Sequence, residues 1–148
     1  MYSQNNIQLY KDVAVFNEDH WQLQQLKTLE SAYRTSPFYE FYIDDLMPLF
    51  SEKPSTIMAL NLKSISLLFD CLQLPLTYRG TTQFNTVSSC KDARSLSNSR
   101  KEITQSFEPY RQVFDGKYGF LGNLSMLDLL FNEGPNAELY LNAQTVNL

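Results

Sequence analysis

Residues 119–135 read GFLGNLSMLDLLFNEGP, and they carry the densest set of fold signals in the chain. Four of the five glycines lie within residues 116–134, where glycine gives the backbone the freedom that tight turns need. Ser125, followed three positions later by Asp128, matches a capping box and predicts a helix over about 126–132. The glycine–proline pair that follows predicts the end of this helix.

Helical patterns also dominate the rest of the chain. Three helices are predicted over about 20–34, 37–50 and 56–74, because each has a capping residue or proline at its start and apolar residues every three or four positions. Two short β-branched or alternating runs, DVAVF at 12–16 and LTYR at 76–79, predict strands. We therefore expect an α+β fold that is predominantly helical, with a few short strands.

The chain length of 148 residues predicts a single compact domain, 1–148. Residues 80–109 differ in composition from the rest, since only seven of residues 81–108 are apolar. This stretch is predicted to be a long irregular connection, and connections of such length usually have a function or lack order.

Composition and charge exclude several classes of protein. With 43% hydrophobic residues the chain can build a core, and its net charge of −4, from 12 basic and 16 acidic side chains, argues against nucleic-acid binding. The N-terminus lacks the pattern of a signal peptide, and the most apolar stretch, 65–76, is interrupted by polar residues and proline, so no membrane span is expected. These features predict a cytoplasmic protein.

Few residues suggest catalysis by themselves. His20 is the only histidine, and no serine or cysteine near it has the setting of a nucleophile, so a surface position is expected. Cys71 falls in an apolar helical stretch and is interpreted as a core residue. Glu40 and Asp44 share a helix face, either solvated or with a cation between them. The chain has no motif for a dinucleotide, a P-loop or a zinc site, so no cofactor and no metal are expected.

The polar connection carries a local excess of basic side chains, namely Lys91, Arg94, Arg100 and Lys101. A basic loop of this kind could close over a phosphate group or a nucleotide sugar. The alternative interpretation is a solvated loop.

Aromatic side chains gather just before the closing segment. Tyr110, Tyr118 and Phe120, with Arg111 and Lys117, could form a wall on which a sugar stacks. Aromatic residues at this density also serve as core, and that alternative stays open.

Several segments resemble the WbqC-like family. Residues 20–46 are similar to the family's central segment, in which a tryptophan helix leads to an AY…SPF turn; the positions concerned are Trp21, Ala32, Tyr33, Ser36, Pro37 and Phe38. Asp92-Ala93-Arg94 is similar to an acid–x–Arg element of the family. The closing segment, 110–135, is the strongest match, and the likeness extends over about 12–141.

The chain also departs from the family's pattern. Full family members begin with a further basic segment, so the resemblance is interpreted as covering the family's C-terminal two-thirds, with the N-terminal segment absent. Gln25 stands where a histidine is common, and Gly122 stands where proline is usual. A missing segment would expose surface that it normally covers, which predicts self-association into a homo-oligomer.

The resemblance implies a role in bacterial surface-polysaccharide biosynthesis, including the O-antigen of lipopolysaccharide. Family members are described as transferases, and a nucleotide sugar or another anionic small molecule is the implied ligand. The implied substrate-binding residues are Asp92, Arg94, Asn123, Ser125, Asp128 and Asn132. The alternative is a non-catalytic interaction or scaffold protein, or an inactive truncated remnant of the family, so whether the chain is an enzyme stays open.

Overall fold

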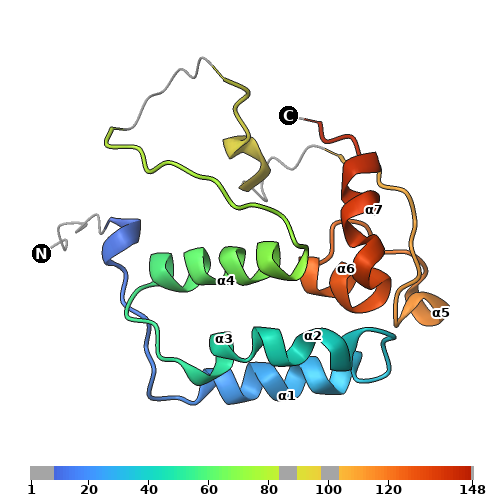
Figure 1. Ribbon diagram of the computed structural model, residues 1–148, viewed down its shortest axis with the longest axis horizontal. Coiled ribbons are helices and arrows are strands. Elements are labelled where there is room, and N and C mark those ends of the chain that lie inside the picture. Colours follow the sequence, from blue (N-terminus) through green and yellow to red (C-terminus); the bar gives the residue numbers. More distant parts are fainter. Residues whose placement is uncertain (1–8, 84–89, 98–103, 148) are drawn as a thin grey trace, which may run out of the picture.

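The computed structural model describes residues 9–83, 90–97 and 104–147, and its regular elements are helices (Figure 1). The α-helices are α1 (Trp21–Tyr33), α2 (Tyr39–Leu46), α3 (Pro48–Ser51), α4 (Ile57–Cys71), α5 (Asp115–Tyr118), α6 (Met126–Glu133) and α7 (Ala137–Ala143). Short 3-10 helices are η1 (Tyr10–Asp12), η2 (Arg94–Ser97) and η4 (Gly134–Asn136).

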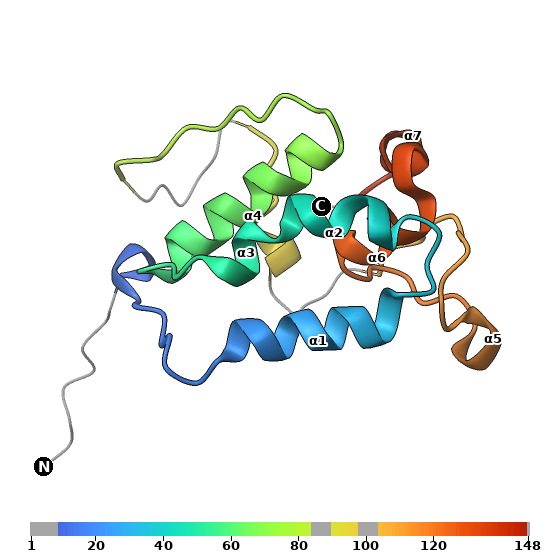
Figure 2. The ribbon, with the colours of Figure 1, turned by 60° about the horizontal axis from the view of Figure 1, so that its bottom comes forward.

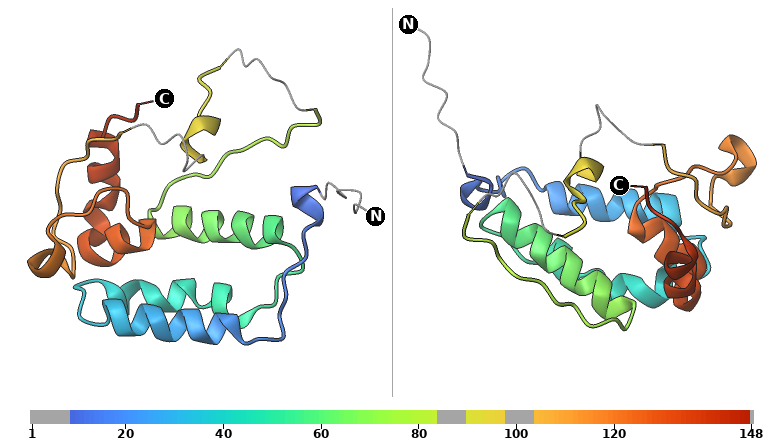
Figure 3. Two further views of the ribbon diagram at one scale, coloured as in Figure 1. Left: turned by 180° about the vertical axis from the view of Figure 1, so that it is seen from behind. Right: turned by 90° about the horizontal axis from the view of Figure 1, so that it is seen from above.

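The helices form two parts that meet at α2. Helices α2 and α3 lie between α1 and α4, as Figure 2 shows, and α2 also contacts α6. Helices α6 and α7, joined by η4, stand together at one end of the molecule, and the segment that precedes α6 passes beside them (Figure 3). Helix α2 is therefore the centre of the packing.

The core lies where α2 and α6 meet. Buried side chains of α2 (Tyr39, Tyr42, Ile43 and Leu46) pack against Leu130 and Phe131 of α6. The Phe131 ring is fully buried, and its centroid lies 5.3 Å from that of Tyr33 and 5.1 Å from that of Tyr39. Tilted and edge-on contacts of this kind add to the stabilisation that burial alone provides.

A close contact fixes the end of α6 against the turn before α2. The Phe38 N–H donates to the Phe131 carbonyl at 3.0 Å. Gly134 has φ +54°, and a Cβ placed on it would lie 2.5–2.7 Å from atoms of the Phe38 ring. Only glycine allows this backbone conformation and this approach together. Two segments almost a hundred residues apart are joined here.

The expected strands are not present among residues 9–83, 90–97 and 104–147, so the β component of the α+β prediction is wrong. Residues 12–16 make only an isolated antiparallel bridge, between Ala14 and Thr56. The pairing cannot lengthen, because α4 begins at Ile57 on one side and Pro54 lies on the other. The Asn17 carboxamide donates to the Pro54 carbonyl at 2.8 Å and takes the place of a further backbone pair.

Residues 76–79 continue from α4 as chain without regular structure, because no neighbouring strand pairs with them in the described residues. The predicted helices are confirmed, except that the stretch 37–50 is divided at Met47 into α2 and α3, because Pro48 has no N–H with which to continue α2. Helix α4 is shorter than predicted, ending at Cys71 rather than near residue 74.

Candidate functional site

Side-chain amides hold the irregular segment that precedes α6. Gln112 is buried; its Nε2 donates to the Leu121 carbonyl at 2.8 Å, and its Oε1 accepts from the Leu121 N–H at 2.9 Å. Gln105 binds the backbone of Asn147 in the same two-way manner, at 2.9 Å and 2.9 Å. A carboxamide has one acceptor and one donor group and can replace a backbone pair of a sheet. The segment is thereby fixed beside α6 and α7 without forming a strand.

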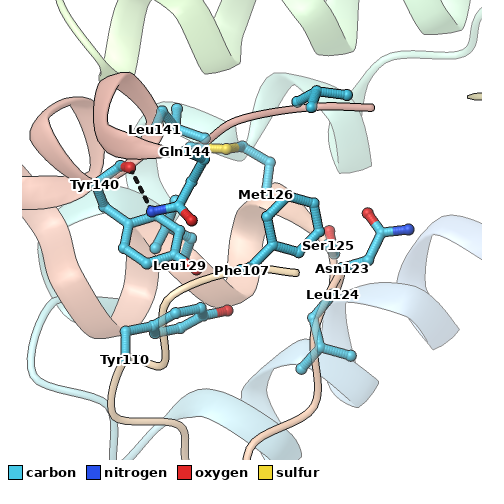
Figure 4. Close-up of a pocket in the computed structure, with 11 residues that line it drawn as sticks. Phe107, Tyr110, Asn123, Leu124, Ser125, Met126, Leu129, Tyr140, Leu141 and Gln144 are labelled. Carbon is cyan, nitrogen blue, oxygen red and sulfur yellow. Dashed lines mark hydrogen bonds between the residues drawn. The ribbon is translucent and has the colours of Figure 1, made fainter. Parts of the chain in front are cut away.

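An inner cavity of about 270 Å³ lies between this segment and the helices α6 and α7. Figure 4 shows the rings of Phe107, Tyr110 and Tyr140 around it, with Met126 of α6 and Leu141 of α7. The remaining lining residues are Asn123, Leu124, Ser125, Leu129, Gln144 and Val146. Most of its wall is hydrocarbon or aromatic, as is usual for pockets that bind small molecules.

An outer cavity of about 290 Å³ adjoins the inner one. It is lined by Thr104, Gln105, Phe107, Gly122 and Asn123. Phe107 and Asn123 line both cavities and form the boundary between them. We call the two together the paired cavity.

A buried carboxylate lies behind the wall of the inner cavity. Asp128 is only 2% exposed, and its Oδ2 accepts a hydrogen bond of 2.6 Å from the Tyr110 hydroxyl. Burial, and then the charge and hydrogen bond of Asp128, raise the pKa of Tyr33 to about 12. Burial and the same carboxylate also raise the pKa of Tyr110. Both phenols therefore stay protonated near neutral pH and act as hydrogen-bond donors rather than as bases.

The predicted site residues of the closing segment have local structural roles. The Ser125 hydroxyl caps α6 by accepting from the Leu127 N–H at 3.3 Å, and Asn132 donates to the Asp128 carbonyl one turn before it. The carboxylate of Asp128 points to Tyr110 instead of closing the predicted capping box. Asn123 has φ +59°, a conformation that asparagine tolerates better than most residues. Of these four, only Asn123 and Ser125 line the paired cavity.

Asp92 and Arg94 form an exposed ion pair with each other. The Arg94 Nε lies 2.8 Å and 3.0 Å from the two carboxylate oxygens, and Nη2 lies 2.5 Å from Oδ2. The hydrogen bonds from Arg94 lower the pKa of Asp92 to about 2. Neither residue lines the paired cavity, so the structure does not join them to Asn123 and Ser125. Lys91 beside them is exposed, whereas Arg100 and Lys101 lie outside the described residues.

The other candidate residues of the sequence are dispersed. His20 is exposed at the start of α1, and Glu40 and Asp44 are exposed on α2. Cys71 packs against the core, where burial raises the pKa of its thiol. In residues 9–83, 90–97 and 104–147, no three His, Cys, Asp or Glu side chains gather to hold a metal ion. Within these residues, no helix has both the length and the apolar character needed to cross a membrane.

The aromatic residues that were expected to form one wall lie in different places. Tyr110 packs edge-on against Phe120 and Tyr140, with ring centroids 5.6 Å and 5.0 Å away, and also lines the inner cavity. Tyr118 is exposed, with the Lys117 ammonium group 4.9 Å from the centre of its ring. Tyr110 can therefore face a ligand from the cavity wall, and Tyr118 is not part of that wall.

Helix α7 contributes to the candidate site, which was not predicted from the sequence. Tyr140, Leu141 and Gln144 all line the inner cavity. Together with buried Ala137 they have the spacing i, i+3, i+4 and i+7 of one helix face, which was the available signal.

The fold and site define a small helical protein with a paired cavity at one end, whose described lining residues carry no charge. Residues 2–105 match the WbqC-like protein family, and the chain belongs to this family. No curated protein and no solved structure matches the chain.

The position of the family match corrects the expectation from sequence. The match covers the N-terminal part of the chain rather than its C-terminal two-thirds, and the segment 119–135 lies outside it. That segment is recognisable mainly through caps, turns and core residues, which are features of folding in general. The part of the chain that matches the family packs against this segment, because Tyr33 contacts Phe131 and Phe38 contacts Gly134.

Proposed function

We propose that this protein is a transferase, or part of one, in the biosynthesis of bacterial surface polysaccharide such as the O-antigen of lipopolysaccharide. Membership of the WbqC-like family over residues 2–105 carries the proposal, because members of this family are associated with that pathway. The paired cavity is the proposed binding site for the group that is transferred or for its acceptor.

The geometry supports a binding site at this place for three reasons. The cavity has a wall of three aromatic rings, and aromatic faces pack well against the apolar faces of sugars and against acyl groups. Its irregular side is held by the paired amides of Gln105 and Gln112, so it is formed before a ligand arrives. Asn123 stands between the two cavities, with its carboxamide turned outward (Figure 4). An amide there can bind a hydroxyl or carbonyl group.

Asp92 and Arg94 remain proposed ligands for the anionic part of an activated donor. A guanidinium group suits phosphate, and Arg94 would exchange its contact with Asp92 for one with the donor.

A non-catalytic role in the same pathway is the second candidate, and a specific observation favours it. Asp128, the buried carboxylate nearest the cavity, is hydrogen-bonded to Tyr110 behind the wall and does not line the cavity. A carboxylate in that position stabilises the fold and does not reach a substrate.

A transfer assay distinguishes the two candidates. The protein is incubated with carbohydrate acceptors and a panel of acyl donors and nucleotide sugars, and the acceptor mass is followed by mass spectrometry. A transferase increases the acceptor mass by that of the transferred group. If no donor and acceptor pair gives a mass increase, the transferase proposal is contradicted and the non-catalytic role is favoured.

A matched pair of variants locates the reaction. Leu141→Trp fills the inner cavity from α7, whereas Leu139→Trp adds the same ring on the same helix at a position that is 70% exposed and outside the cavity. We expect the first variant to lose transfer and the second to keep it. Equal activity of the two variants would show that the reaction takes place elsewhere.

A further inference from the structure

We propose that the ligand of the paired cavity is a neutral amphiphile, with a short acyl or alkyl group in the inner cavity and an uncharged polar head in the outer one. This inference rests on the proposed function, because it names the class of molecule that the same site would bind. It is carried by the side chains that line the two cavities and by the few polar groups among them that have no partner in the described part of the chain.

Apart from Asn123, at the boundary with the outer cavity, the amide and phenol groups of the inner cavity are engaged within the protein. The Tyr140 hydroxyl donates to the Glu108 carbonyl at 2.6 Å, and the Tyr110 hydroxyl donates to Asp128. Both ends of the Gln144 carboxamide are used, since Oε1 accepts from the Glu108 N–H at 3.0 Å and Nε2 donates to the Tyr140 carbonyl at 2.9 Å.

A sugar seated against the wall of the inner cavity would exchange hydrogen bonds to water for few free partners in that wall, and each unmade bond is costly. A hydrocarbon group has no such bonds to lose. The inner cavity therefore favours an apolar occupant.

The outer cavity has a more polar lining. Thr104 and Asn123 provide a hydroxyl and a carboxamide there, whereas both ends of the Gln105 carboxamide are used by the Asn147 backbone. The Asn123 carboxamide has no partner among the described residues and is available to a ligand. A head with hydroxyl or amide groups fits this compartment.

The charge of the lining and the size of the inner cavity narrow the class of ligand further. Among the described residues that line the two cavities, none is charged. An anionic group would leave water without meeting a cation from these described residues, which is unfavourable. The inner cavity, at about 270 Å³, lies just below the usual range for drug-sized ligands and suits a short chain rather than a long lipid tail.

Methionine methyl groups provide a direct test by NMR. The protein is labelled with ¹³C at its methionine methyl groups and titrated with methyl, butyl, hexyl and octyl glucoside below the concentrations at which they form micelles. Met126 lines the inner cavity, whereas Met47 and Met58 lie on α2–α3 and α4 and serve as internal controls.

We expect selective movement of the Met126 signal and an affinity that rises with chain length. Each methylene group that leaves water should tighten binding by about fourfold, until the cavity is full and the affinity levels off. Sodium hexanoate, which has a comparable chain and a charged head, should bind more weakly than hexyl glucoside. A Met126 signal that moves no more than those of Met47 and Met58 would overturn the proposal, and so would equal binding of hexanoate.

Two variants test the compartments separately. Leu141→Trp should abolish the dependence on chain length, and Leu139→Trp should preserve it. Asn123→Gly removes the carboxamide, and glycine tolerates the positive φ at this position. This variant should weaken the binding of hexyl glucoside several-fold. Equal binding by Leu141→Trp and Leu139→Trp, each with wild-type helicity by circular dichroism, would refute the assignment of the inner cavity.

The two proposals fail in different ways. Selective binding at Met126 without any transfer would leave the amphiphile site standing and contradict the transferase. Transfer without selective binding at Met126 would support the transferase and contradict the amphiphile site.

Discussion

Replacing Gly134 with alanine tests the contact that joins the two parts of the molecule. Gly134 has φ +54° and ψ −123°, a region open essentially to glycine alone, and forcing another residue into it costs about 1–3 kcal/mol. Its new Cβ would also approach the Phe38 ring to 2.5 Å. Overpacking of a core by one carbon adds about 1–3 kcal/mol. We therefore expect Gly134→Ala to lower the free energy of unfolding by about 4 kcal/mol.

Alanine variants at two other glycines distinguish the cost of backbone strain from the cost of the steric contact with Phe38. Gly119 also has a positive φ, +68°, but nothing lies within 4 Å of its Cβ position, so Gly119→Ala should cost only the strain, about 2 kcal/mol. Gly116 lies in α5 with open space around it, and Gly116→Ala should be neutral or slightly stabilising.

Urea unfolding followed by circular dichroism measures the three differences. The excess of Gly134→Ala over Gly119→Ala should shrink when Phe38 is replaced with leucine, because the ring is then gone. Equal costs for Gly134→Ala and Gly119→Ala, with no response to Phe38→Leu, would refute the contact between the turn and α6.

Three further predictions concern the site. Tyr110→Phe should destabilise the protein by about 2 kcal/mol in urea unfolding, because Asp128 loses a donor; no change would show that this bond is absent in solution. Ser125→Ala should lower the free energy of unfolding by about 1 kcal/mol, and Ser125→Asp should leave it nearly unchanged, because aspartate also caps a helix. Equal losses for the two variants would show that the Ser125 side chain does not cap α6. Tyr33 has its pKa raised from 10.0 to about 12, so its contribution to stability should be intact below pH 10 and fall as the pH rises toward 12. Unfolding at pH 9 and pH 11 checks this, and Tyr33→Phe should reduce the difference.

The helices could be predicted because their signals are local. Ser125 and Thr56 cap α6 and α4 through their own side chains, and Pro48 divides α2 from α3, so a few neighbouring residues decide each boundary. The prediction of strands was wrong because the signal for a strand is not local. A strand needs a partner, and the pairing of Ala14 stops where Pro54 lies on the other chain segment. That partner is not visible in the residues of 12–16.

The site was only partly predictable for a related reason. Asn123 and Ser125 were predicted from the resemblance of the closing segment to the family, and both line the inner cavity. Phe107 was missed because its segment is held by the two-way amide bonds of Gln105, which no spacing in the sequence reveals. A glutamine that replaces a backbone pair looks in the sequence like any other polar surface residue.

Inhibition of transfer by a ligand of the paired cavity tests whether this cavity binds a substrate of the reaction. Hexyl glucoside is added to the transfer assay while occupancy is read from the Met126 methyl signal in the same buffer. We expect transfer to fall in proportion to that occupancy and methyl glucoside to inhibit far less. Undiminished transfer with the Met126 site saturated would contradict this expectation.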